Sequence, residues 1–313
     1  LAKPKFGGWV SFTAHLSLKE DFKLYRITNT NEKKTRPFGY GVNYQNIKIG
    51  SLPKNLLITA IDKNFYKYLP EIPDGTHLVI HDPTELKKEL LPHLIRFNII
   101  TIRDTVQKLL LDKHNINSVF MPHPFYPYLL SEPTKDKEGV VSVSRIDYDK
   151  HTDVLIDANK LLDSPIDIYG AKNTLYIYRK LGDTLDQYYK GCFDKDFIEL
   201  DKILSKYKYM IDLSAIKGDG GGSQYTFLEA RYHGNVLILS KAWLKGNTLF
   251  ENEKNCLIVN DAEEIKELVD IKKIDTDLIL ENSKELLDKH LNADWSFNDV
   301  MIAHQIAGLD VGL

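Results

Sequence analysis

The amino-acid sequence predicts a mixed α/β protein made of two Rossmann-like, doubly wound domains that face each other across a cleft. Three observations carry this prediction. The chain has 313 residues, which is more than one domain of ordinary size. Short apolar runs alternate with helical patterns along its length, as is typical of parallel sheets covered by helices on both faces. A polar, proline-bearing stretch at residues 132–138 interrupts the alternation once, as a linker would.

The linker divides the chain into a first domain at residues 1–134 and a second at 135–295. In the first domain, strands are expected at 22–28, 55–60, 76–82, 98–104 and 118–121, with helices at 10–18, 63–69, 84–91 and up to about residue 112. In the second, strands are expected at 140–144, 167–170, 209–214, 236–239 and 257–260, with helices at 153–162, 225–232 and 262–269. Helical stretches at 277–291 and 296–306 follow. The helix at 153–162 shows the pattern, because its apolar residues fall on one stripe.

Composition excludes several classes of protein. With 43% hydrophobic and 27% charged residues, the sequence is that of a soluble globular protein rather than a disordered chain. No apolar stretch approaches the roughly 18 residues of a spanning helix, and no basic-then-apolar leader opens the sequence. Cys192 and Cys256 are too few for a disulfide framework or a zinc site. We therefore expect a cytoplasmic protein.

Charge is distributed unevenly along the chain. The net charge is −3, but residues 1–134 carry 18 Lys+Arg against 12 Asp+Glu, so +6, and the remainder carries 23 against 32, so −9. This asymmetry favours two surfaces with different partners, with a polyanion drawn to the first domain. The alternative is a drift in charge between domains without functional meaning.

Two glycine-rich loops each precede a helix. Gly7 and Gly8 stand before the helix at 10–18, and the loop Lys217–Ser223, which contains Asp219 and Gly221, stands before the helix at 225–232. Glycine lets the N–H groups of a helix N-terminus approach an anionic ligand closely. The pair Gly7–Gly8 is also compatible with an ordinary tight turn.

Two cations follow the first strand of the second domain. Arg145 and Lys150 lie between the strand at 140–144 and the helix after it. A diphosphate there would be stabilised by both cations and by the helix dipole, whereas the alternative is two solvated surface charges. Asp147 and Asp149 form a D-x-D between them, which we interpret as an exposed loop rather than a metal site.

Three acidic or basic side chains complete the set of candidates. Glu229 lies among apolar residues, where a carboxylate is costly unless paired; a ribose diol would pair with it, and the alternative is a glutamate on the helix surface. His81 and Asp82 end a strand, where an acid–base group facing an acceptor would stand. Asp82 before Pro83 also suits a helix N-cap, and the two interpretations are compatible. We treat His123 and His151 as structural.

These residues resemble the donor domain of two-domain (GT-B) retaining glycosyltransferases that use nucleotide sugars. The resemblance implies that Arg145 and Lys150 bind the donor diphosphate and that Glu229, as the second Glu of an E-x7-E motif, binds the ribose. Gly221 stands where the first Glu would be, so Asp219 is the candidate substitute. His151 stands where the family usually has Gly.

The rest of the chain is also similar to this family. Gly7–Gly8 corresponds to its first glycine loop, His81–Asp82 to a strand-end His-Asp, and Tyr169–Gly170 to a strand-turn glycine. The helix within 296–313 corresponds to one that crosses back to the first domain. The motif Tyr225-Thr226-x-Leu228-Glu229, without the first Glu, looks closest to the DNA α-glucosyltransferases of T-even phages.

The resemblance implies a monomeric, retaining glycosyltransferase of the host cytoplasm that needs no metal or other cofactor. It would move a sugar from UDP-glucose or a similar donor to a hydroxymethylated pyrimidine in phage duplex DNA. Arg145 and Lys150 would bind the diphosphate, with the helix N-terminus at Tyr225 and Thr226 beside them. His81 and Asp82 would lie near the attacking hydroxyl. The candidate DNA phosphate contacts are Lys33, Lys34, Arg36, Lys63, Lys67 and Arg103. The alternatives are a glycan or lipid-linked acceptor, and a non-catalytic module that binds nucleotide sugars or nucleic acid.

Overall fold

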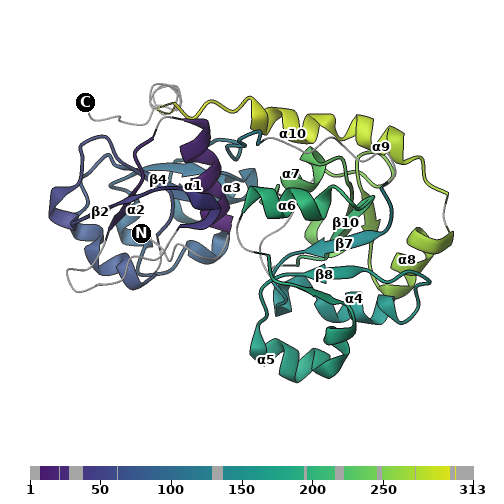
Figure 1. Cartoon of the computed structure of the whole chain (residues 1–313). Coiled ribbons are helices and arrows are strands. Elements are labelled where there is room, and N and C mark those ends of the chain that lie inside the picture. Colours follow the sequence, from purple (N-terminus) through teal and green to yellow (C-terminus); the bar gives the residue numbers. More distant parts are fainter. Residues whose placement is uncertain are drawn as a thin grey trace. The chain divides into compact units, whose positions relative to one another are not determined.

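The computed structural model describes residues 8–20, 22–27, 38–61, 63–128, 137–193, 196–215, 222–244, 249–271, 273–296 and residue 300. The chain divides into two compact units, coloured by sequence in Figure 1. Unit 1 comprises Leu1–Pro127 and Lys289–Leu313, and unit 2 comprises Tyr128–Asp288. The boundaries drawn from the sequence, at residues 134 and 296, lie seven residues later at both places.

Six parallel strands form the sheet of unit 2. They are β7 (Val140–Val143), β8 (Asp167–Tyr169), β9 (Tyr189–Gly191), β10 (Tyr209–Asp212), β11 (Val236–Ser240) and β12 (Leu257–Val259). Their spatial order is β12-β11-β10-β7-β8-β9. This is the doubly wound order of a Rossmann fold, which confirms the α/β class and the doubly wound sheet predicted for the second domain. The order reverses between β7 and β10, so the carboxyl ends of these two strands are the expected position for a ligand.

Helices cover both faces of this sheet (Figure 1). The α-helices of five or more residues are α4 (Thr152–Asn159), α6 (Phe197–Leu204), α7 (Tyr225–Tyr232), α8 (Ala262–Lys266) and α9 (Thr276–Asn282). The other helical segments are η5 (Tyr148–Lys150), α5 (Thr174–Tyr176), η6 (Ile177–Leu181), η7 (Gly182–Gln187), η8 (Lys241–Leu244) and η9 (Glu267–Ile271). Helices α4, α8 and α9 belong to one apolar core, and α6 and α7 to another. Ile211 joins the first core and Met210 the second, because successive strand residues point to opposite faces.

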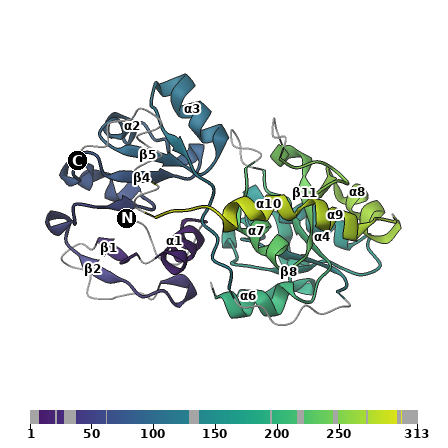
Figure 2. The same ribbon diagram turned by 90° about the horizontal axis from the view of Figure 1, so that it is seen from above.

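In the described part of unit 1, four parallel strands form one sheet and two further parallel strands form a pair. The larger sheet has the order β3 (Leu57–Ile58), β4 (His77–Ile80), β5 (Asn98–Thr101) and β6 (Val119–Phe120), and the smaller pairs β1 (Tyr25–Ile27) with β2 (Gln45–Ile47). The helices are α1 (Gly8–Lys19), η1 (Gly39–Gly41), η2 (Ile49–Ser51), η3 (Lys63–Glu71), η4 (Pro83–Glu85), α2 (Leu91–Leu94) and α3 (Asp104–His114). In Figure 2, α1 lies on the same side of unit 1 as β1 and β2.

The chain returns to unit 1 at Lys289, in the last turn of α10 (Lys284–Leu291). The Lys19 ammonium donates to the Leu291 carbonyl at 2.6 Å, and the Trp295 indole N–H donates to the Pro122 carbonyl at 2.9 Å. The Trp295 ring also meets Phe12 of α1 edge-on, with 5.2 Å between centroids. The return therefore begins before the helix expected at 296–306, of which only residues 296 and 300 are described.

One predicted helix of unit 1 is wrong. Residues 84–91 were expected to be helical, but the chain makes one 3₁₀ turn at η4, leaves helical geometry at Leu86 (φ −75°, ψ 65°) and starts again at α2. Leu90 is fully buried, so tertiary packing overrides the helical pattern here. The sequence also missed β2 and β9, which have no buried residue and therefore no apolar run that would indicate a strand.

Candidate functional site

Lys150 stands at the switch point of the unit 2 sheet. It ends η5, the short turn after β7, and only 8% of the residue is exposed. Its ammonium donates to Asp212 Oδ2 at 3.3 Å, to Gln224 Oε1 at 3.3 Å and to Ser214 Oγ. An ammonium has three N–H donors, so three protein oxygens accept from it. These oxygens come from the end of β10 and from the residue before α7, which fixes the ammonium over the carboxyl ends of β7 and β10.

Asp212, the last residue of β10, connects the groups around Lys150. Its carboxylate accepts from the Ser214 N–H at 2.8 Å, from the Ser214 hydroxyl, and from the Thr226 hydroxyl of α7 at 3.2 Å. Burial by itself would raise the pKa of Asp212, but the Lys150 charge and the Ser214 donors outweigh it and lower that pKa below its ordinary value. The sequence analysis missed Asp212, Ser214 and Gln224; a carboxylate ending an otherwise apolar strand was the available signal.

Arg145 is half-exposed and bound by its own loop. Its guanidinium donates to Asp147 Oδ2 at 2.9 Å and to Asp149 Oδ2 at 3.1 Å. Asp147 Oδ1 accepts from Asn173 Nδ2 at 2.8 Å, which ties this loop to the one after β8. The D-x-D therefore orients a cation, a role that the sequence analysis did not assign to it. Among the described residues, no three His, Cys, Asp or Glu side chains gather as metal ligands would.

Gly170, which follows Tyr169 at the end of β8, packs closely against the backbone at the start of the Arg145 loop. Its φ is +147°, and a Cβ at this position would lie 1.7 Å from the Ser144 carbonyl oxygen. Only glycine permits this approach, which holds the residue preceding Arg145 against β8. His151 shows the opposite case, because it has the left-handed conformation (φ 47°, ψ 44°) at the position where glycine is usual in the similar family. Histidine adopts this conformation more readily than most residues.

Helix α7 begins beside this cluster. Tyr225 and Thr226 form its first turn, and the Thr226 hydroxyl contacts Asp212. Glu229 is only 5% exposed, so the alternative of a glutamate on the helix surface is wrong. Its carbonyl accepts from the His233 N–H at 3.1 Å and bonds His233 Nδ1 at 2.7 Å. The structure thus brings Arg145, Lys150 and α7 to one edge of the sheet.

In unit 1, His81 follows β4 and is 8% exposed. Its Nε2 lies 2.6 Å from the Thr59 carbonyl, and the Phe12 ring of α1 packs edge-on against it at 4.9 Å. Burial lowers the pKa of His81 to about 4, so the imidazole is neutral at pH 7. Asp82 caps η4 by accepting from the Thr84 N–H at 2.8 Å with Pro83 in the first turn, as the capping interpretation predicted.

Glu85 is a group of unit 1 that the sequence analysis missed. Its carboxylate accepts from the His81 backbone N–H at 2.8 Å. Burial, and then the nearby Asp82 charge, raise the pKa of Glu85 to about 8. A carboxyl group whose pKa is raised to the neutral range thus stands next to the predicted His-Asp pair. The spacing Asp82-x-x-Glu85 was the signal for it, since it is typical of a capped helix start.

The remaining predicted residues are dispersed. Gly8 opens α1 with nothing within 4 Å of a Cβ placed on it. Lys63 and Lys67 are exposed on η3, and Arg103 precedes α3. Residues predicted to bind donor or DNA that lie outside the described part of the chain are Gly7, Lys33, Lys34, Arg36, Asp219 and Gly221.

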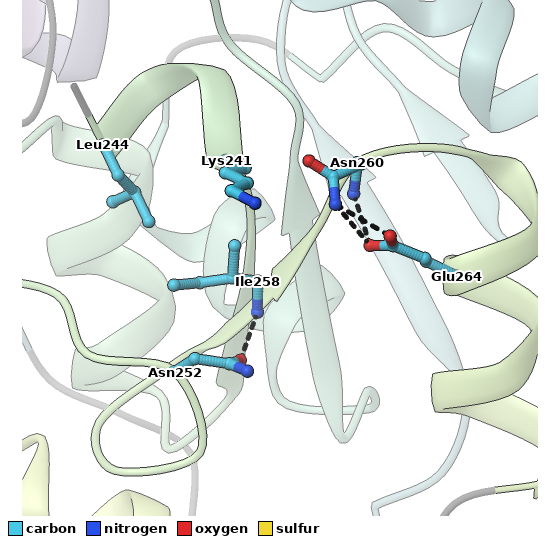
Figure 3. A pocket seen from close by; sticks show the side chains of 6 residues that line it. All are labelled: Lys241, Leu244, Asn252, Ile258, Asn260 and Glu264. Carbon is cyan, nitrogen blue, oxygen red and sulfur yellow. Dashed lines mark hydrogen bonds between the residues drawn. The ribbon is translucent and has the colours of Figure 1, made fainter.

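A cavity of about 560 Å³ with a mixed polar and apolar lining lies at the carboxyl ends of β11 and β12 (Figure 3). The side-chain amide of Asn260 donates to Glu264 at 2.7 and 2.9 Å, and Asn252 accepts from the Ile258 N–H at 2.8 Å. These lining groups serve local structure. The cavity lies toward the β12 edge of the sheet, away from the switch point between β7 and β10.

Solved structures of other proteins have folds similar to that of this chain. No protein-family model and no curated protein matches the sequence. Solved structures with a similar fold include Anabaena HepE in complex with UDP (TM-score 0.58, 14% identity, 78% of this chain and 77% of that one) and a glycosyltransferase from Rickettsia africae ESF-5 (TM-score 0.57, 14% identity, 96% and 94%). A mutant of S. aureus TarM in complex with fondaparinux, α-GlcNAc-glycerol and UDP is also similar (TM-score 0.53, 17% identity).

The match to TarM covers 74% of this chain and spans half the length of TarM. Within the part of the chain that the structure describes, no helix has the length and apolar character needed to cross a membrane.

The similarity to these solved structures shows that the chain has the two-domain α/β fold of these glycosyltransferases, with the GT-B arrangement of parallel sheets and helices predicted from the sequence.

Proposed function

We propose that the protein is a retaining glycosyltransferase that moves a sugar from a nucleotide-sugar donor, UDP-glucose or similar, to a hydroxyl acceptor. The observation that carries this proposal is the position of Arg145 and Lys150 at the carboxyl edge of a Rossmann sheet, at its switch point and beside the start of α7. Solved structures of the same fold include complexes with UDP and with UDP-glucose.

In the proposed reaction the bond between the sugar and the diphosphate breaks, and negative charge builds on the departing diphosphate. Cations that are already in place stabilise that charge without reorganisation, which lowers the barrier. Lys150 is held by buried partners and Arg145 by its own loop, so both are oriented before the donor arrives. These cations replace a metal ion in the proposal, and activity is expected to survive EDTA.

For the acceptor, we propose a hydroxymethylated pyrimidine in duplex DNA. Residues 1–134 carry a charge of +6, and Lys63 and Lys67 are exposed on η3. A polyanion would be attracted to such a surface, and an enzyme that modifies a base must also extrude it from the helix. A neutral His81 can accept a hydrogen bond from a hydroxyl at its free ring nitrogen, but it is too weak a base to remove a proton fully.

A glycan acceptor is the second candidate. It is favoured by the carbohydrate complexes among structures of this fold, such as TarM with α-GlcNAc-glycerol. The two candidates share the donor site and differ only in what unit 1 would bind.

The test is a transfer assay in EDTA with UDP-glucose and UDP-GlcNAc as donors. The acceptors are hydroxymethylcytosine duplex DNA, the same DNA without the hydroxymethyl group, and oligosaccharides. We expect glycosylated nucleosides in the mass spectrum of the first DNA alone, in the same anomeric configuration as the donor. Transfer to oligosaccharides only would establish the glycan candidate. No transfer or donor hydrolysis with any pair would refute the enzyme proposal.

A further inference from the structure

Gln224 contacts Lys150 but has a side-chain group that the cluster does not use. It is the residue before α7, with extended backbone (φ −125°, ψ 156°), and its side chain does not cap the helix. Its Oε1 accepts from the Lys150 ammonium at 3.3 Å. Gln224 is therefore positioned by the side chain that the proposed function places at the donor diphosphate.

The orientation of the Gln224 amide is set by chemistry. An ammonium offers only donors, so the amide oxygen must face Lys150 and the NH₂ group must face the other way. That Nε2 atom is buried, and no residue in the described part of unit 2 accepts a hydrogen bond from it. A buried N–H group without an acceptor is costly, so it calls for an explanation, of which a bound ligand is one.

The surroundings of this NH₂ group favour an oxygen-bearing, anionic ligand. Lys150 supplies a positive charge next to it, and the N-terminal end of the eight-residue helix α7 adds the positive end of a helix dipole. The phosphate oxygens of a nucleotide sugar and the hydroxyls of its sugar are acceptors of this kind. Asp212 and Ser214 hold Lys150 independently, so Gln224 is not needed to position that cation.

We propose that Gln224 is a donor-binding residue whose Nε2 donates a hydrogen bond to an oxygen of the nucleotide sugar while its Oε1 stays on Lys150. This inference rests on the proposed function and adds a specific contact to it. The oxygen belongs either to the diphosphate or to the transferred sugar. A contact to the diphosphate would affect the affinity for both UDP and UDP-glucose, whereas a contact to the sugar would affect only the affinity for UDP-glucose.

The experiment is a calorimetric titration of the full chain with UDP and with UDP-glucose. Gln224→Met keeps the length of the side chain and removes both polar groups. Gln224→Glu keeps an oxygen for Lys150 but replaces the NH₂ group with an oxygen that repels phosphate. Gln107→Met is the matched control, because Gln107 donates to the Ser118 carbonyl at 2.8 Å within unit 1. Thermal unfolding identifies any variant that fails to fold.

Both Gln224 variants are expected to bind roughly tenfold more weakly, as for the loss of one hydrogen bond to a charged or polar oxygen. An equal loss for UDP and UDP-glucose assigns the contact to the diphosphate, and a loss for UDP-glucose alone assigns it to the sugar. Wild-type affinity of both variants for both ligands overturns the inference and leaves the proposed function intact. If the wild type itself binds neither ligand nor any other nucleotide sugar, both fail together.

Discussion

Replacing Lys150 with Ala tests whether the switch-point cluster is a coupled, buried unit. The Lys150 and Asp212 side chains are 9% and 1% exposed, with 3.3 Å between Nζ and Oδ2. Removal of one partner of a buried ion pair costs about 3–5 kcal/mol, because the other charge is left uncompensated. The Ser214 donors to Asp212 remain in the variant, so we expect about 3 kcal/mol, at the lower end of that range.

The assay is thermal unfolding at pH 7 with urea titration as a second measure. For a unit of this size, about 3 kcal/mol corresponds to a fall in Tm of roughly 6–12 °C. Lys254→Ala is the control, because its pair with Glu251 is exposed and should contribute about 0.5 kcal/mol or less. The Asp212 pKa is lowered in the folded state, so the stabilisation is present above the ordinary value of 3.8 and is lost as the pH falls below it.

A double variant shows whether the Lys150 and Asp212 side chains contribute to stability as a coupled pair or independently. Lys150→Ala with Asp212→Asn should regain part of the lost stability, because a neutral amide replaces the uncompensated carboxylate. If Lys150→Ala melts within about 2 °C of the wild type, or if the two losses simply add, the pair is not coupled and the geometry has been read wrongly.

Three further predictions follow from the structure. Gly170→Ala should lower the free energy of unfolding by well over about 1 kcal/mol and lower donor affinity, because the added Cβ would overlap the Ser144 carbonyl. Urea unfolding measures this loss against that of Gly182→Ala, whose φ is also positive but which has open space around it. Equal losses in the two variants would exclude the clash. His151→Val should be about 1–2 kcal/mol less stable than His151→Gly by the same assay, because φ is 47°, and equal stability would contradict the left-handed conformation. His81 alone should contribute a loss of about 1.4 kcal/mol per pH unit from pH 6.5 towards 4, where the unfolded chain binds a proton that the buried imidazole, with its pKa of about 4, does not. Buried His290 acts in the same direction and Glu85 in the opposite one, so the contribution is measured as the difference in slope between the wild type and His81→Gln at equal ionic strength, and equal slopes would contradict it.

The sequence predicted the parts of the site that are local. Arg145 and Lys150 follow an apolar run and precede a helical pattern, so their place at a strand end could be inferred from neighbours in the chain. The fold class followed in the same way, from the repeated alternation of strands and helices. Gly170 after β8 was also recognised, because the turn that needs it is local.

The partners of Lys150 could not be predicted in this way. Asp212 and Gln224 are 62 and 74 positions further along the chain, and they reach Lys150 only because β10 returns to the free side of β7. Sequence periodicity predicts that these strands exist, but it carries no information on which strands are neighbours. Glu229 was similarly ambiguous, since its burial depends on which face of α7 packs on the sheet.

The two cations of the site differ in how freely they can exchange partners. Asp147, Asp149 and Asp212 place three carboxylates against Arg145 and Lys150, so an incoming diphosphate meets charges that are already compensated. The pairs of Arg145 are partly exposed to solvent, so the guanidinium can exchange a carboxylate for a phosphate at a smaller cost than a buried pair would require. The Lys150–Asp212 pair is buried, and breaking it is costly. In the proposed function, Arg145 is therefore the adaptable group that follows the diphosphate, and Lys150 is the fixed charge that sets its position.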